Sequence, residues 1–142
     1  MEKQKAKIFL SRIESYLLEH GISVDYGADL ANVYWPTADM IEINTRQDYE
    51  SRVYSLLHEA GHVRLRSSGD PQKKFPFMKK RLEGANGEYR RDMPHRIDVL
   101  REEVLAWESG EQLAFDLGIP LDVERWSKQR TKYITSYVKW TI

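Results

Sequence analysis

The sequence predicts a single small α+β domain in which helices flank a short β-sheet. Two observations lead to this fold class. Apolar residues recur at helical spacing in four segments, and three short extended segments lie together between the first two of them. The 142 residues are 41% hydrophobic and 31% charged, so the chain can bury one modest core. We therefore treat residues 1–142 as one domain.

The four segments with helical periodicity are residues 2–20, 48–66, 95–117 and 122–139. Gly21 and Gly118 follow the first and third segments, at positions where glycine commonly ends a helix. Asp122 can cap the start of the fourth. Residues 67–94 are rich in Gly, Pro, Lys and Arg and are predicted to be a basic loop insertion, with one helical turn around "FMKKRLE".

Three extended segments, "ISVDY", "ANVYW" and "MIEIN", are each bounded by turn-forming residues. They are predicted to form one three-stranded, mainly antiparallel sheet. In "MIEIN", Ile41 and Ile43 alternate with their neighbours, as in a strand with one buried face. We also expect this strand to be an edge strand, which can bind an extended peptide through main-chain hydrogen bonds.

Composition excludes several classes of function. The chain has 22 basic and 22 acidic residues, so no net charge favours nucleic acid or a membrane surface. It has no cysteine, which excludes disulfides, thiolate metal sites and cysteine nucleophiles and leaves histidine and carboxylate as metal ligands. No signal peptide and no membrane-spanning apolar run is recognisable. We expect a cytoplasmic protein without membrane contact.

The stretch "YSLLHEAGHVRLR" contains His58, Glu59 and His62 within the second predicted helix. Residues four apart on a helix differ in direction by about 40°, so the two histidines project side by side and can bind one ion. Zinc suits two nitrogen ligands at this spacing, and the pattern predicts one Zn²⁺ per chain. Glu59 lies one position round the helix, where it can act as the general base on a metal-activated water.

A catalytic zinc site normally has a third protein ligand, which must come from elsewhere in the chain. A stripe of small residues runs along the third predicted helix and favours close packing against the motif helix. Glu103 lies within about 20° of the middle of this stripe and Glu102 about 80° to one side. Glu103 is therefore the predicted ligand, and Glu102 is expected to be a surface charge. The stripe consists of Ala106, Gly110 and Ala114.

Two assignments stay open. His95 is the competing third ligand, since it is the histidine that follows the motif in the chain, although an exposed or capping role is more typical at a helix start. The transition state of peptide hydrolysis also needs a hydrogen-bond donor for its oxyanion. The candidate donors are Tyr89, His95, Tyr133 and Tyr137.

These residues resemble those of zinc metallopeptidases of the gluzincin kind, and among them the ImmA/IrrE-like domains of bacteria and mobile elements. The resemblance covers about half of the chain: "MIEIN", then "SRVYSLLHEAGHVRL" in place of the active-site helix, then "EVLAWESGEQLAFDLGIP" in place of the glutamate helix. It implies a zincin-like fold, with His58, His62 and Glu103 as zinc ligands and Glu59 as the general base. It further implies a protein or peptide substrate, such as a repressor or another regulator, and a phage or mobile-element origin.

Residues 64–101 contain 11 basic and 5 acidic side chains with aromatic residues between them. A solvated connector is the simplest interpretation of such a segment. It also motivates an alternative function, a nucleic-acid-associated protein. A further alternative is a metal-stabilised binding module, such as a phage factor that sequesters a host protein. The expected contacts with an acidic or nucleic-acid-bound partner are Lys79, Lys80, Arg81, Arg90 and Arg91.

Overall fold

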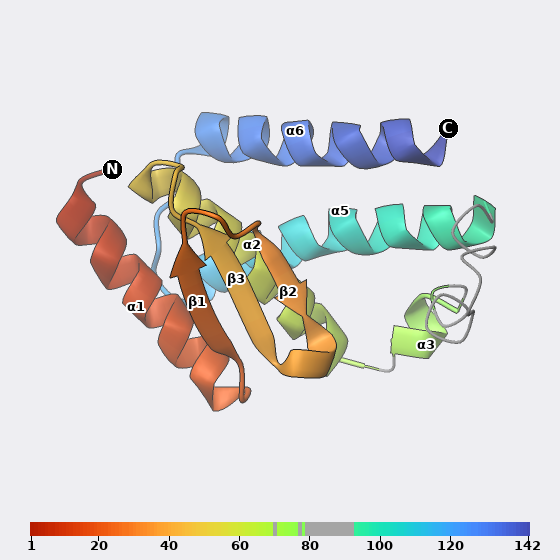
Figure 1. Cartoon of the computed structure of the whole chain (residues 1–142), viewed down its shortest axis with the longest axis horizontal. Coiled ribbons are helices and arrows are strands. Elements are labelled where there is room, and N and C mark those ends of the chain that lie inside the picture. The colour runs from red at the N-terminus through yellow and green to blue at the C-terminus, as the bar shows by residue number, and fades with distance from the viewer. Residues whose placement is uncertain (70, 77, 79–92) are drawn as a thin grey trace.

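The computed structural model describes residues 1–69, 71–76, 78 and 93–142 (Figure 1). The elements, in chain order, are α1 (Lys3–Glu19), β1 (Ser23–Gly27), β2 (Val33–Trp35), the 3-10 helix η1 (Pro36–Ala38), β3 (Met40–Asn44), α2 (Tyr49–Ser67), α3 (Pro71–Lys74), α5 (Met93–Asp116) and α6 (Val123–Thr141). They confirm the predicted α+β class, and the four long helices begin and end within two residues of the predicted positions. The helical turn expected around "FMKKRLE" lies, except for Met78, outside the described residues.

The ends of the long helices follow the sequence signals. Gly21 and Gly118 have positive φ angles of 73° and 67°, which glycine adopts without steric cost, directly after α1 and α5 have ended. Asp48 caps α2 by accepting a hydrogen bond from the backbone N–H of Ser51, and Asp122 caps α6 in the same way. In the described part of the chain, no helix is long and apolar enough to cross a membrane.

The sheet is mixed, with strand order β1-β3-β2. β3 pairs antiparallel with β2 and parallel with β1, so the prediction of a mainly antiparallel sheet was wrong in part. The short connection through η1 makes β2 and β3 antiparallel neighbours, and β1 adds to the other side of β3. "MIEIN" is therefore the central strand and not an edge strand. The alternation of more and less buried side chains along this strand was predicted correctly, because Ile41 and Ile43 are fully buried and their neighbours are only partly buried.

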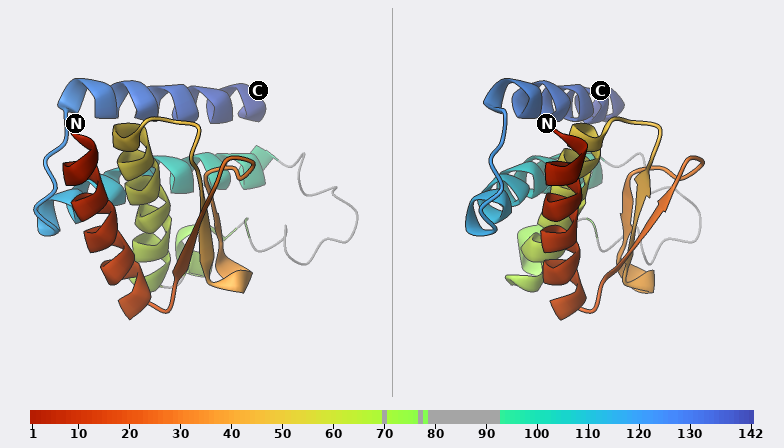
Figure 2. Two further views of the ribbon diagram at one scale, coloured as in Figure 1. Left: turned by 60° about the vertical axis from the view of Figure 1, so that its left-hand side comes forward. Right: turned by 90° about the vertical axis from the view of Figure 1, so that its left-hand side faces the viewer.

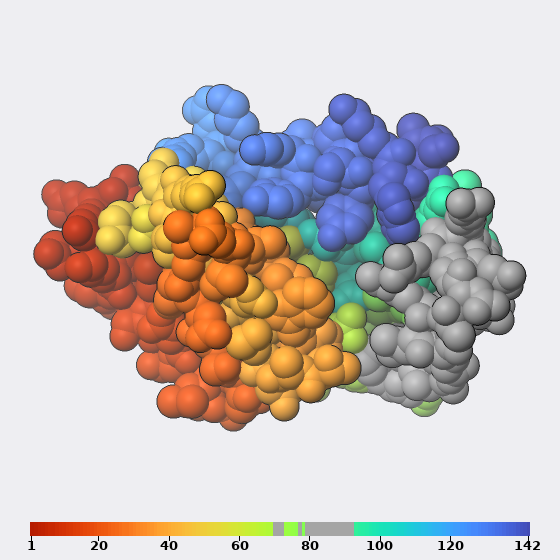
Figure 3. All heavy atoms as spheres, viewed as in Figure 1, coloured from red at the N-terminus to blue at the C-terminus, as the bar shows by residue number. Residues whose placement is uncertain are grey.

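Helix α2 lies at the centre of the molecule. The sheet covers one side of it, α1 lies alongside, and α5 lies on the side away from the sheet (Figure 2). In space-filling representation, α6 forms one long edge of the face that carries the strands (Figure 3). Every residue from Val53 to Gly61 is buried, so the polar residues within this range lie inside the fold and need partners there. The largest buried apolar side chains around α2 are Ile13, Leu17, Ile41, Ile43, Leu113, Trp107 and Trp126.

Candidate metal centre

Two glycines allow α2 and α5 to approach until their backbones touch. A Cβ atom on Gly61 would lie 2.1 Å from the carbonyl oxygen of Ala106, and one on Gly110 would lie 2.6 Å from the carbonyl oxygen of Leu57. Both distances are shorter than the Cβ contacts found in proteins, so neither site accepts a larger residue without movement of the helices. The stripe of small residues on α5 thus has the predicted effect, with Gly61 opposite it on α2.

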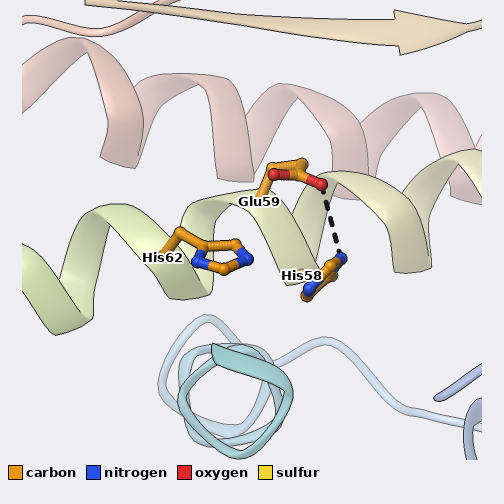
Figure 4. Close-up of side chains that lie close together, drawn as sticks. All are labelled: His58, Glu59 and His62. Carbon is orange, nitrogen blue, oxygen red and sulfur yellow. Dashed lines mark ion pairs between the residues drawn. The ribbon is translucent and has the colours of Figure 1, made fainter. Parts of the chain in front are cut away.

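This close approach places Glu103 against both histidines of α2. Its Oε1 atom lies 2.6 Å from Nε2 of His58, and its Oε2 atom lies 3.2 Å from Nε2 of His62. On α2 itself, Glu59 Oε1 lies 3.4 Å from Nδ1 of His58. The rings project from α2 on the side of α5, with Glu59 one step round the helix (Figure 4). The structure therefore brings together the four residues that the sequence singled out.

Two of these atoms pair only with each other. Nε2 of His58 and Oε1 of Glu103 are buried and form an ion pair at 2.6 Å, and neither makes a hydrogen bond of regular geometry with the described residues. Buried polar atoms that lack such bonds in native proteins often mark an ion or water. A cation bound between α2 and α5 would be contacted by both. The ligand atoms of His58, Glu59 and His62 lie within 4.8 Å of one another, an arrangement that can hold a metal ion.

Glu102 is not the surface charge that we expected. Its side chain is buried, and its Oε1 atom lies 3.2 Å from Nδ1 of His62. Arg66 donates hydrogen bonds to both of its oxygens, at 3.2 and 3.3 Å. The prediction was wrong because α2 and α5 are so close that adjacent positions of α5 both face α2. Arg66 was the available signal, since it follows His62 by four residues and shares its helix face.

His95 is also buried, against the expectation of an exposed or capping residue. Its ring packs edge-on against Trp140 from the end of α6, with ring centroids 6.2 Å apart. His95 precedes Glu103 by eight residues on α5, which is about 12 Å along the axis, so it is not part of the histidine and glutamate cluster. Local sequence could not reveal this contact, because Trp140 lies 45 residues further along the chain.

Among the candidate oxyanion donors, Tyr133 lies next to the cluster. Its ring centroid is 6.2 Å from that of His58, and its hydroxyl accepts a hydrogen bond of 3.3 Å from Asn32 Nδ2. Tyr137 instead packs against Trp140 near the end of α6. Tyr89 lies outside the described residues.

The electrostatics of the cluster favour a cation. Burial by itself lowers the pKa of His62, but its contacts with Glu102 and Glu103 raise that pKa to about 10. Burial raises the pKa of Glu103, but its contacts with the two histidines lower that pKa to about 2. The pKa of Glu102 is lowered as well, by His62 and Arg66 against the effect of burial. The imidazolium of His62 thus balances buried carboxylates, and a metal cation bound here would take over this role by displacing the proton.

The basic segment is partly neutralised within the chain. Arg64, Arg66 and Arg101 each pair with a carboxylate on α5, at 2.8, 3.1 and 3.2 Å. These arginines, which lie at the two ends of the segment, are therefore already occupied. The residues predicted to contact a partner lie outside the described part of the chain: Lys79, Lys80, Arg81, Arg90 and Arg91.

In comparisons with known proteins, no protein-family model, no curated protein and no solved structure matches this chain. The resemblance to gluzincins and to ImmA/IrrE-like domains therefore stays a prediction from the sequence motifs.

Proposed function

We propose that this chain is a zinc-dependent metallopeptidase with a zincin-like fold, in which His58, His62 and Glu103 bind the metal and Glu59 is the general base. The observation that carries the proposal is that one carboxylate meets the Nε2 atoms of two histidines, at 2.6 and 3.2 Å. Two nitrogens and one carboxylate are a ligand set of catalytic zinc sites, which keep a fourth position for water or substrate. Two of the three ligands also contribute a buried atom that has no regular hydrogen bond with the described residues besides the contact of the two with each other, which fits a site built for a cation.

Each side chain has a distinct task in this proposal. A bound zinc ion supplies Lewis acidity toward a carbonyl group and lowers the pKa of water. Glu59 is a neighbour of the ligands but takes no part in the contacts of Glu103, so its carboxylate is available to accept a proton from water and to pass it to the leaving amine. Glu102, held by Arg66, bonds Nδ1 of His62 and so keeps Nε2 directed at Glu103.

A peptide is the substrate class that the surroundings favour. Within the described residues, β1 and β2 each pair with another strand on one side only, so these two replace "MIEIN" as strands that can bind an extended peptide. Tyr133 is our candidate for the oxyanion donor. Because its hydroxyl accepts the bond from Asn32, its own proton is available for donation.

Hydrolysis of a peptide library, followed by mass spectrometry, tests the proposal when the parent is compared with Glu59→Gln. The zinc-loaded parent should cleave peptides, lose this activity with a chelator and regain it with added zinc. Glu59→Gln should keep one zinc per chain, because Glu59 is not a ligand, and should lose at least about 100-fold in rate. Equal cleavage by the two proteins would refute the role of Glu59.

A metal-stabilised binding module is the second candidate. The enclosure of the site favours it, since His58, Glu59 and Glu103 are each at most 5% exposed and a structural metal needs no open position. In that case the zinc-loaded parent would cleave no peptide, and Glu59→Gln would match it in every biological assay. The described arginines Arg64, Arg66 and Arg101 pair with carboxylates within the chain, so these three residues give no support to the nucleic-acid alternative.

A further inference from the structure

We infer that Trp107 is a positioning residue of the metal centre, whose indole holds the imidazole of His58 in the orientation that directs Nε2 toward Glu103. The two rings are stacked, with centroids 4.1 Å apart and planes inclined by 9°. This inference rests on the metal site proposed above, and it does not depend on peptidase activity.

The two histidines of the site are held in different ways. A metal-binding histidine usually donates its second ring nitrogen to a carboxylate, a carbonyl or water, which fixes the plane of the ring. His62 follows this rule through Nδ1 and Glu102, at 3.2 Å. Among the described residues, the polar atom near Nδ1 of His58 is Oε1 of Glu59, at 3.4 Å, which is longer than a good hydrogen bond. Glu59 is moreover the residue that the proposed reaction needs free to handle protons.

The indole of Trp107 provides the missing constraint. A ring in face-to-face contact with a large rigid surface cannot rotate about χ2 without losing that contact, so the stack defines the imidazole plane. Trp107 also follows Glu103 by four residues on α5 and therefore shares its helix face. The same face of α5 thus supplies one proposed ligand and holds another.

Trp107 is itself fixed in place. It is fully buried, and α6 packs two aromatic rings against it, with centroids 5.0 Å away for Trp126 and 5.8 Å away for Tyr133. Its Nε1 atom has no hydrogen-bond partner among the described residues. Trp126 shares this feature, so the unpaired donor does not set Trp107 apart. The stack on the imidazole of His58 does.

Zinc affinity, measured by competition with a chromophoric chelator, tests this inference together with the melting temperature. Trp107→Leu removes the stacked ring and should weaken zinc binding by about 10-fold to 100-fold, the usual loss when a ligand's orienting partner is removed. Trp107→Phe keeps an aromatic face and should stay within about threefold of the parent. Trp126→Leu is the matched control, since Trp126 is equally buried and contacts Trp107, whereas the described rings that contact His58 are those of His62, Trp107 and Tyr133. It should lower the melting temperature, and because it acts on His58 only through Trp107, it should weaken zinc affinity clearly less than Trp107→Leu does.

Parent-like zinc affinity of Trp107→Leu would overturn the inference, and so would an equal loss of affinity in Trp126→Leu, because packing alone would then explain the effect. If Trp107→Leu does not fold, Trp107→Met takes its place, since it fills more of the volume without a ring. A parent protein that binds no zinc would overturn the metal site itself. Zinc binding by the parent together with an unaffected Trp107→Leu would overturn only the role of Trp107.

Discussion

Replacing Gly61 with alanine tests whether the close packing of α2 on α5 creates the metal site. In an ordinary helix interior this change stabilises a protein by about 1 kcal/mol. Here the added Cβ would lie 2.1 Å from the carbonyl oxygen of Ala106, whereas real Cβ contacts are essentially never shorter than 3.0 Å. The difference between these two distances means that the helices must separate by about 0.9 Å or more at this point.

The stability cost follows from this separation. Overpacking a core typically costs about 1–3 kcal/mol, and the upper end applies because a backbone atom cannot be moved aside by a change of rotamer. Subtracting the gain of about 1 kcal/mol in helix propensity leaves a net destabilisation of about 2 kcal/mol. For a chain of this size, that corresponds to a loss of about 4–8 °C in melting temperature.

Zinc binding should suffer more than stability. Metal–ligand distances tolerate deviations of about 0.2 Å, so a shift of α5 by about 0.9 Å moves Glu103 out of range of His58 and His62. We expect zinc affinity to fall by more than about tenfold. Gly110→Ala, with a contact of 2.6 Å, should have a smaller effect, and Gly27→Ala, which meets only the Leu30 side chain at 3.1 Å, is the control. An unchanged or higher melting temperature of Gly61→Ala with parent-like zinc affinity would refute this reasoning.

The remaining predictions concern the residues around the ligands. Glu102→Gln should weaken zinc binding about 10-fold in chelator competition, because it removes the charge that holds Nδ1 of His62, and unchanged affinity would contradict this role. Zinc binding at pH 8 should release about one proton, because the pKa of His62, raised to about 10, keeps its imidazole protonated until the metal displaces the proton. Calorimetry of zinc binding in several buffers measures this release. A binding enthalpy that does not depend on the ionisation enthalpy of the buffer would contradict it. In the metal-free protein, the same proton should stabilise the fold fully below the unfolded pKa of 6.5, and this contribution should decline as pH rises toward 10. Tyr133→Phe should keep the zinc affinity of the parent but lower the rate of peptide hydrolysis by about 100-fold. Tyr137→Phe should change neither property. Equal hydrolysis rates for the two variants would exclude Tyr133 as the oxyanion donor.

The cluster could be predicted largely from the sequence because its geometry is mostly local. The spacing of His58 and His62 fixes their relative direction on one helix, and no other part of the chain is needed for that inference. The placement of Glu103 required one non-local assumption, that a stripe of small residues packs against α2. The structure agrees with it, because Gly61 and Gly110 bring the two backbones into contact.

The features that were predicted wrongly depend on contacts between distant segments. The strand order β1-β3-β2 is set by which strands pair through backbone hydrogen bonds. The alternation of Ile41 and Ile43 indicates only which side chains of one strand are buried. Glu102 is buried because Arg66 and His62 reach it from α2, and His95 is buried because Trp140 covers it from α6. The partners of Glu102 and His95 lie more than 30 residues away in the sequence, whereas the strands that pair are nearer to one another.

Diffraction at the zinc absorption edge from crystals of the zinc-loaded protein would locate the proposed metal ion directly. We expect one anomalous peak per chain between α2 and α5, about 2.0–2.2 Å from Nε2 of His58, from Nε2 of His62 and from an oxygen of Glu103. A peak at any other place, or no peak in crystals grown with saturating zinc, would contradict the proposed metal site.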